Sequence, residues 1–182
     1  MSSPSQQAIG DVPILLKREI EARALAPVFE ILIRELGAQR ARAILSEAVT
    51  AHSIAEGKAF AEREEKGASM RTFIDLQHLW TAGGALTHET LQATDDAYDY
   101  RVTHCAYADM YARLGLQDVG TILSCQRDYE FIQGYDPTIE LERSASIMEG
   151  NDHCLFRYRY REGSRPALAN DNEDGEAHSQ TE

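Results

Sequence analysis

The 182-residue chain has little cysteine, few basic residues and no long apolar run. Because no stretch of 18 apolar residues occurs, no segment is predicted to cross a membrane as a helix. The first residues also lack the basic-then-apolar order of a signal peptide. Lys and Arg number 18 against 30 Asp and Glu, which gives a net charge of −12. Such an acidic chain is a poor match for a nucleic-acid backbone or an anionic membrane surface, so we expect neither as a partner.

The chain has only three cysteines. An odd count of three argues against a disulfide framework and favours a reducing compartment, so a cytoplasmic location is expected. No two cysteines form a Cys-x-x-Cys pair, so the usual zinc-finger and redox spacings are missing. The remaining roles are core packing, nucleophilic catalysis and metal ligation.

Both ends of the chain are predicted to lie outside the folded domain. Residues 1–10 are polar and lack periodicity, which indicates a disordered lead-in. Residues 162–182 contain one large aliphatic side chain, Leu168, and six acidic residues against one basic residue, which indicates a disordered acidic tail. The sequence therefore predicts a single folded domain over residues 11–161.

Helical spacing of apolar residues dominates the first half of the chain. It predicts a helix over 13–36, kinked or divided at Pro27, a second over 39–65, and a shorter one from a Ser69 cap to Trp80. The second helix is expected to bury a stripe made mostly of small residues. The predicted stripe is Ile44, Leu45, Ala48, Ala51, Ala55 and Ala59.

Strand patterns dominate the second half. Alternation predicts strands over 85–93, 97–105, 138–148 and 153–160, with helices over 106–114 and 117–125 between the second and third strands. Because helices come first and strands later, an α+β fold is favoured over a doubly wound one. The expected architecture is N-terminal helices packed on an antiparallel sheet of about four strands, with a helical insertion between strands two and three.

Cys125 lies in the most reactive-looking segment, Leu123-Ser124-Cys125-Gln126-Arg127-Asp128, at a predicted helix-to-loop transition. Arg127 is placed to favour the thiolate, and Asp128 to orient a base or a water molecule. The alternative is a buried cysteine at a helix end beside a surface Arg–Asp pair. Cys105 and Cys154 follow histidines in predicted strands, where neighbouring side chains point to opposite faces, so small buried hydrophobes are favoured there.

The last predicted strand is amphipathic. Cys154, Phe156, Tyr158 and Tyr160 share one face, and Arg157 lies on the other. Arg157 together with Arg143 or Arg101 could bind a substrate carboxylate through paired hydrogen bonds. The alternative is that these arginines face solvent.

Several stretches, taken in order, resemble the L-2-amino-thiazoline-4-carboxylic acid hydrolase family, from Val12 to Arg161. They are Lys17–Arg23 with Ala26-Pro27, Val102–Tyr111, Leu114–Leu116 leading to Leu123–Asp128, and Ser146–Gly150 followed by Cys154–Tyr158. The resemblance implies hydrolytic opening of a small cyclic amidine acid, with related ring amides as further candidate substrates. It places the family's motif cysteine on Cys125 and its acid on Asp128. Leu155 stands where the family commonly has Asp.

These observations predict a hydrolase that opens a small heterocyclic amidine or amide. Cys125 would attack the ring carbon, and Asp128, with His104 or Glu149, would move the protons. Arg157, Arg143 and Tyr107 are the substrate-binding candidates. The expected partner is a small heterocyclic substrate, no cofactor is required, and a homo-oligomer is compatible with the sequence.

Three alternatives stay open. In the first, zinc or another divalent metal held by Cys105, Cys125 and Cys154 activates a hydroxide. In the second, the domain binds a small molecule without turnover, because helices followed by an antiparallel sheet are also similar to sensor domains related to vinyl reductases. The third, a helical interaction protein, gives no account of the Cys125 and Cys154 segments.

Overall fold

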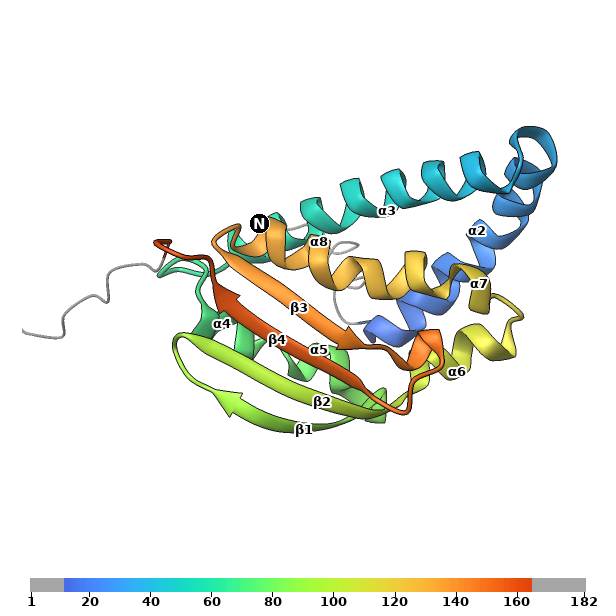
Figure 1. Cartoon of the computed structure of the whole chain (residues 1–182). Helices are drawn as coiled ribbons and strands as arrows, with labels where there is room; N and C mark the ends of the chain where they lie inside the picture. The colour runs from blue at the N-terminus through green and yellow to red at the C-terminus, as the bar shows by residue number, and fades with distance from the viewer. Residues whose placement is uncertain (1–11, 165–182) are drawn as a thin grey trace, which may run out of the picture.

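The computed structural model describes residues 12–164, which begin with two long helices. α2 (Ile14–Leu36) and α3 (Ala38–Ala61) form a hairpin joined at Gly37 (Figure 1). The φ of Gly37 is 78°, a left-handed value that glycine adopts without the Cβ clash of other residues. Pro27 lies inside α2, which runs on as one helix rather than as two.

Two short helices connect α3 to the sheet. They are α4 (Met70–Asp75) and α5 (His78–Thr81), followed by the 3-10 turn η1 (Ala82–Gly84). Ser69 caps α4 as predicted: the Thr72 amide donates to Ser69 Oγ at 3.2 Å, and the Ser69 amide donates to Thr72 Oγ1 at 2.9 Å. The segment up to Trp80 is thus two short helices and not one.

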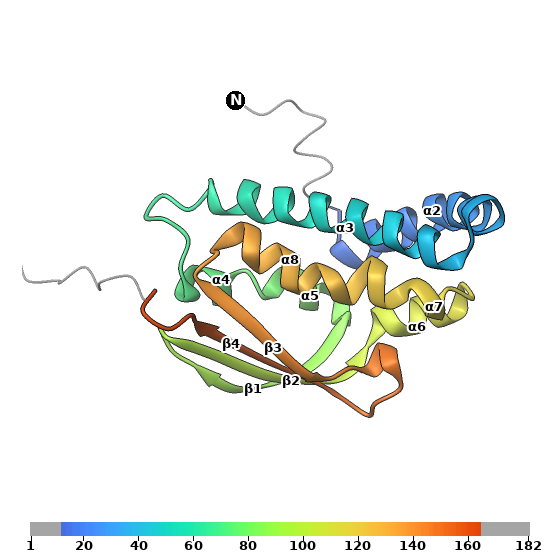
Figure 2. The same cartoon turned by 45° about the horizontal axis from the view of Figure 1, so that its top comes forward.

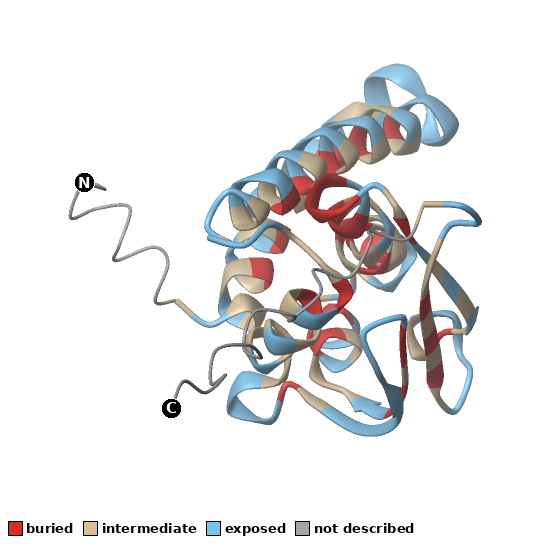
Figure 3. Ribbon diagram, turned by 90° about the vertical axis from the view of Figure 1, so that its left-hand side faces the viewer, coloured by how far each residue is buried: buried red, intermediate tan, exposed pale blue. Residues whose placement is uncertain are grey.

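The four strands form one antiparallel sheet, which confirms the predicted α+β fold. They are β1 (Leu86–Ala93), β2 (Ala97–Cys105), β3 (Ile139–Ala145) and β4 (Cys154–Tyr160), in the order β1-β2-β4-β3. The last two are joined through the 3-10 turn η3 (Ile147–Glu149). In β4 the side chains of Cys154, Phe156 and Tyr158 are buried and alternate with more exposed ones, as the sequence pattern predicts (Figure 3).

The helical insertion between β2 and β3 is longer than the sequence predicts. It contains α6 (Ala106–Arg113), α7 (Gln117–Gly120), a π-helical turn η2 (Thr121–Cys125) and α8 (Gln126–Tyr135). The predicted helix end at Cys125 is therefore wrong, because the backbone stays helical through the π turn and continues to Tyr135. Figure 2 shows α8 between α3 and the sheet, so that the helices cover one face of the sheet in two tiers.

The buried stripe of α3 agrees with the predicted one at Leu45 but differs at the small residues. Ala48, Ala51, Ala55 and Ala59 are all exposed, whereas Ala41, Leu45, Val49, Ser53 and Gly57 are buried at a constant spacing of four. The reason is the close crossing with α8. A Cβ at Gly57 would lie 2.2 Å from the Phe131 carbonyl oxygen, and a Cβ at Gly134 would lie 2.2 Å from the Ile54 carbonyl oxygen. Only glycine allows these backbones to approach so closely, and this contact fixes which face of α3 is buried.

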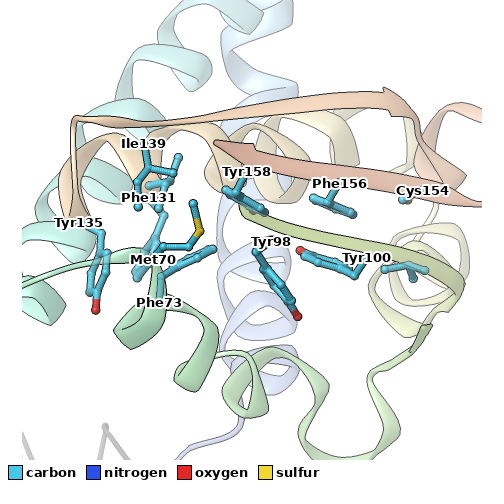
Figure 4. Packing of buried hydrophobic residues seen from close by; sticks show 12 residues of the cluster. Met70, Phe73, Tyr98, Tyr100, Phe131, Tyr135, Ile139, Cys154, Phe156 and Tyr158 are labelled. Atoms are coloured by element: carbon cyan, nitrogen blue, oxygen red, sulfur yellow. The ribbon is translucent and has the colours of Figure 1, made fainter. Parts of the chain in front are cut away.

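Two clusters of buried residues make up the core. One is aromatic and lies between the sheet, α4 and α8; it includes Phe73, Tyr100, Phe131, Phe156 and Tyr158 (Figure 4). The other is mainly aliphatic and lies where α2, α3, α6 and η2 meet. Because α8 continues from η2, this helix connects the two clusters.

The predicted lead-in over 1–10 and most of the predicted tail over 162–182 lie outside the described residues. Within residues 12–164, no helix is long and apolar enough to cross a membrane.

Candidate functional site

A cavity of about 80 Å³ lies between the helices and the sheet. Measured in the same way, one water molecule needs roughly 10–15 Å³, so the cavity has room for a small organic group. Polar and ionisable side chains line part of it: Arg18, Glu56, Cys105, Tyr107, Cys125, Arg127, Asp128, Arg143 and Cys154. Aromatic side chains line much of the rest: Phe60, Phe73, Trp80, Tyr100, Phe131, Phe156 and Tyr158.

Cys125 and Asp128 reach the cavity from one helix. Cys125 ends the π turn η2, and Asp128 follows three residues later in the first turn of α8, so both side chains lie on the same side of the helix. A π turn is a rare interruption of an α-helix and is frequently found at functional sites.

Arg143 of β3 connects these two residues. Its Nη1 donates to Asp128 Oδ2 at 2.9 Å and to the Cys125 backbone carbonyl at 3.5 Å, and its guanidinium lies 5.5 Å from the centre of the Phe156 ring. Burial raises the pKa of Asp128 to about 6, and the Arg143 charge opposes that rise. Asp128 is therefore a carboxyl that can exchange a proton near neutral pH, as a general acid or base must.

The Cys125 thiol is protonated at neutral pH. Its burial raises the pKa to about 12, and the neighbouring Asp128 charge adds to the rise, while Arg143 opposes it. Its Sγ lies 3.9 Å from the Ser146 hydroxyl. The prediction that Arg127 favours the thiolate is wrong, because the Arg127 guanidinium is engaged elsewhere.

Arg127 belongs to a buried ion network across three helices. It donates to Glu21 at 3.0 Å and to the Leu123 carbonyl at 2.7 Å. Arg18 donates to Glu21 at 2.8 Å and to Glu56 at 3.0 Å, so two cations and two carboxylates neutralise one another. This network ties α2 to α3 and α8 at the wall of the cavity.

Sequence reasoning missed Arg18 and Glu56 as cavity residues. The Arg18 side chain is buried in the stripe of α2 that includes Ala22 and Phe29. An arginine at spacings of four and eleven from buried apolar residues is the signal that could have identified it, since a charged side chain in a buried stripe needs partners.

The predicted site residues divide into two groups. Cys125, Asp128, Arg143 and Tyr107 all line the cavity. The Tyr107 hydroxyl donates to the Trp80 carbonyl at 3.2 Å, and burial raises the Tyr107 pKa.

His104, Glu149 and Arg157 do not line the cavity. His104 Nε2 lies 2.9 Å from Asp109 on the surface, and Glu149 is exposed. Arg157 is on the outer face of β4 and pairs with Glu142 at 3.3 Å. The alternation of strand side chains separates Arg157 from the cavity residues Phe156 and Tyr158.

All three cysteines line the same cavity, although they come from three different elements. Burial raises the pKa of Cys105 to about 11 and also raises the pKa of Cys154. Across residues 12–164, no group of three or more His, Cys, Asp and Glu side chains is arranged to hold a metal ion. The donor set of Cys105, Cys125 and Cys154 therefore does not fit the predicted metal alternative.

The fold and the cavity define an α+β domain with a cavity between its helices and its sheet. The chain belongs to the L-2-amino-thiazoline-4-carboxylic acid hydrolase family, whose sequence model matches residues 17–158. The resemblance seen in the sequence is thus confirmed, and the family name denotes hydrolysis of a cyclic thiazoline acid.

Other comparisons are more distant. No curated protein matches the chain. A similar solved structure is the crystal structure of the phenol-responsive sensory domain of the transcription activator PoxR with phenol. Its TM-score is 0.49 at 14% sequence identity, and the match covers 75% of this chain and 73% of that one.

Proposed function

We propose that the protein is a hydrolase that opens a small cyclic amidine or amide at a ring C–N bond, with Cys125 as the nucleophile. The observation that supports this is the grouping of Cys125, Asp128 and Arg143 at one cavity wall. Arg143 contacts both the Asp128 carboxylate and the Cys125 backbone carbonyl, and the three-residue spacing places the thiol and the carboxyl on the same side of one helix.

Proton transfer accompanies the attack in this mechanism. The thiolate is not populated at neutral pH, because the pKa of Cys125 is about 12, whereas Asp128 is ionised above about pH 6. Asp128 takes the Cys125 proton while Sγ bonds to the ring carbon, and the ring nitrogen leaves with that proton as its C–N bond breaks. The covalent intermediate is a thioester from an amide and a thioimidate from an amidine. Water then adds to its carbon, the hydroxyl oxygen stays on that carbon, and Sγ leaves with the proton that the water gives up, so that one water is consumed in total.

The remaining cavity residues contribute charge and position. Arg143 is a guanidinium at the reacting end, where it can stabilise the negative charge that develops on the attacked group. Tyr107 contacts the substrate from α6. For these roles, the Arg143 guanidinium and the Tyr107 side chain must lie within hydrogen-bond distance of the bound substrate, about 3 Å.

The test is a screen of cyclic amides and amidines for products that have gained the mass of one water. Cys125→Ala should abolish turnover while the protein stays folded, and Cys125→Ser should be severely impaired because a hydroxyl is far less ionised than a thiol. Cys154→Ala is the matched control, since Cys154 is a buried cysteine of the same cavity. A folded Cys125→Ala protein with near-normal turnover would exclude the nucleophile role.

A second candidate is a domain that binds a small molecule without converting it. The observation that favours it is the protonated Cys125 thiol in a cavity lined largely by aromatic side chains. This candidate predicts that ligands raise the melting temperature and that no product forms with any compound of the screen.

A further inference from the structure

The cavity changes character along its length, and α8 shows the change first. Cys125 and Asp128 line one end, and Phe131 follows one turn later. At 1.5 Å per residue, Phe131 lies about 9 Å along the helix axis from Cys125. The helix thus presents ionisable groups at its start and an aromatic ring further on.

α3 runs in the same direction as α8 and adds a ring to the aromatic end. Ser46 contacts Gln126 at 2.9 Å, and eleven residues later Gly57 meets the backbone at Phe131. Phe60 of α3 lines the aromatic end, where its ring packs 5.5 Å from Phe131.

Strand β4, on the sheet side of the cavity, also runs from the ionisable end to the aromatic end. Cys154, Phe156 and Tyr158 follow one another along the inner face of the sheet (Figure 4). Phe73 marks the far end, since its ring lies 4.8 Å from that of Tyr158 and 5.9 Å from that of Tyr135 at the end of α8. α8 and β4 therefore both run from the ionisable groups to the aromatic rings, and α3 adds Phe60 at the aromatic end.

We propose that the cavity selects ligands with two ends: a flat aromatic group packed among Phe131, Trp80 and Phe73, and an amidine or amide whose N–H groups meet Asp128. The substrate class is then an aryl-substituted cyclic amidine or amide. That such a ligand is a substrate rests on the proposed function. Its binding in the cavity does not depend on turnover.

Asp128 is the group that receives the ligand. Within residues 12–164, its Oδ2 accepts the Arg143 hydrogen bond and its Oδ1 accepts none, and 29% of its side chain stays accessible. An N–H donor is the complement of an ionised carboxylate oxygen, and a cationic amidine makes the stronger, charge-assisted bond.

Aromatic rings at the other end favour a ring over an aliphatic chain. Trp80 and Phe131 meet edge to face with centroids 5.1 Å apart, and Phe60 also meets Phe131 edge to face at 5.5 Å. A flat ring can add a further edge or face contact to such a cluster, in addition to its buried area.

The probes are benzamidine, benzamide and acetamidine. Benzamidine carries both ends, benzamide replaces the cation by a neutral amide, and acetamidine lacks the ring. We expect benzamidine to bind tightest above pH 6, and acetamidine to bind at least about tenfold more weakly because it buries far less apolar surface. Calorimetry gives the affinities, and the fluorescence of Trp80, the only tryptophan of the chain, reports occupancy of the aromatic end.

Variants test which residue binds each end of the ligand. Phe131→Leu should weaken benzamidine binding at least about threefold and leave acetamidine binding unchanged. Its matched control is Phe29→Leu, a buried aromatic residue of the second core cluster that does not line the cavity. Asp128→Asn should remove the preference for benzamidine over benzamide.

Equal affinities of wild-type protein for benzamidine and acetamidine, or a Trp80 signal that does not respond to benzamidine, would overturn the inference. Equal losses in Phe131→Leu and Phe29→Leu would do the same. These outcomes are separate from those of the proposed function: a protein that binds benzamidine as described but hydrolyses nothing refutes only the hydrolase proposal. Cys125-dependent turnover without any preference for an aryl group refutes only this one.

Discussion

Gly57 is the residue at which a single methyl group should separate two helices. In Gly57→Ala the new Cβ would lie 2.2 Å from the Phe131 carbonyl oxygen and 2.8 Å from the Tyr135 amide nitrogen, both backbone atoms of α8. Ordinary contact begins at 3.4 Å, so α3 and α8 must move apart by roughly 1 Å. No rotation of a side chain can relieve this contact, because both opposing atoms belong to a helix backbone.

The magnitude follows from two opposing terms. Overpacking of a well-packed core costs about 1–3 kcal/mol, and a backbone contact belongs at the upper end. Replacing a helical glycine by alanine contributes about 1 kcal/mol in the other direction through helix propensity. The free energy of unfolding should therefore fall by about 2 kcal/mol. For an m-value of about 2 kcal/mol/M, the urea midpoint falls by about 1 M.

Urea unfolding followed by circular dichroism measures this shift. Ala55→Gly is the matched control, because Ala55 is exposed on the same helix and its replacement measures the propensity term alone, about 1 kcal/mol of destabilisation. The double variant Gly57→Ala/Gly134→Ala should cost less than the sum of the singles, since one separation of the helices accommodates both methyl groups. A midpoint for Gly57→Ala equal to or above that of the wild type would refute the close crossing.

Three further predictions concern the buried charges and the thiol. Arg18→Met should lower the free energy of unfolding by about 3–5 kcal/mol, because it leaves the carboxylates of Glu21 and Glu56 without that cation; a loss under about 1 kcal/mol in urea unfolding would contradict this. The folded-state pKa of Asp128 is about 6, above its ordinary value of 3.8, so the folded protein binds this proton more tightly and loses stability as the pH rises from about 4 to 6. Melting curves across this range should show that loss in wild type relative to Asp128→Asn, and a pH-independent difference would count against it. Iodoacetamide at neutral pH should alkylate Cys125 at least about 100-fold more slowly in the native protein than in urea, as mass spectrometry of the labelled peptide can measure; equal rates would show an accessible, ionised thiol.

The fold was predictable because its signals are local. Alternation along β2 and β4 and helical spacing along α2 and α3 are properties of consecutive residues, and the sheet follows from them. The buried face of α3 was not predictable, since alanines lie on several of its faces and only the contact between Gly57 and α8 decides among them. The continuation of the helix past Cys125 was missed for a similar reason, because Arg127 and Asp128 look like surface residues until Glu21 and Arg143 are placed beside them.

The candidate site was predictable in part. Cys125 and Asp128 are close in sequence and share a helix, so their proximity in space needed little more than their spacing. Arg143 comes from strand β3 of the sheet, and its pairing with Asp128 of α8 depends on packing between layers that no local pattern encodes. For Arg157, the strand pattern already indicated the face opposite Phe156, and the side chain does lie there.

The π turn over 121–125 changes the direction in which the side chains of one long helix point before and after it. Buried residues recur at a spacing of four from Val119 through Leu123 and Arg127 to Phe131 and Tyr135. In an uninterrupted α-helix of 3.6 residues per turn, each such step rotates the side chain by about 40°, so the last of them would face well away from the first. The wider turn takes up part of this drift and lets the same helix bury residues in the aliphatic core and in the aromatic one. A one-residue deletion here would therefore turn one end by about 100° relative to the other, and either Val119 or Tyr135 would lose its buried position.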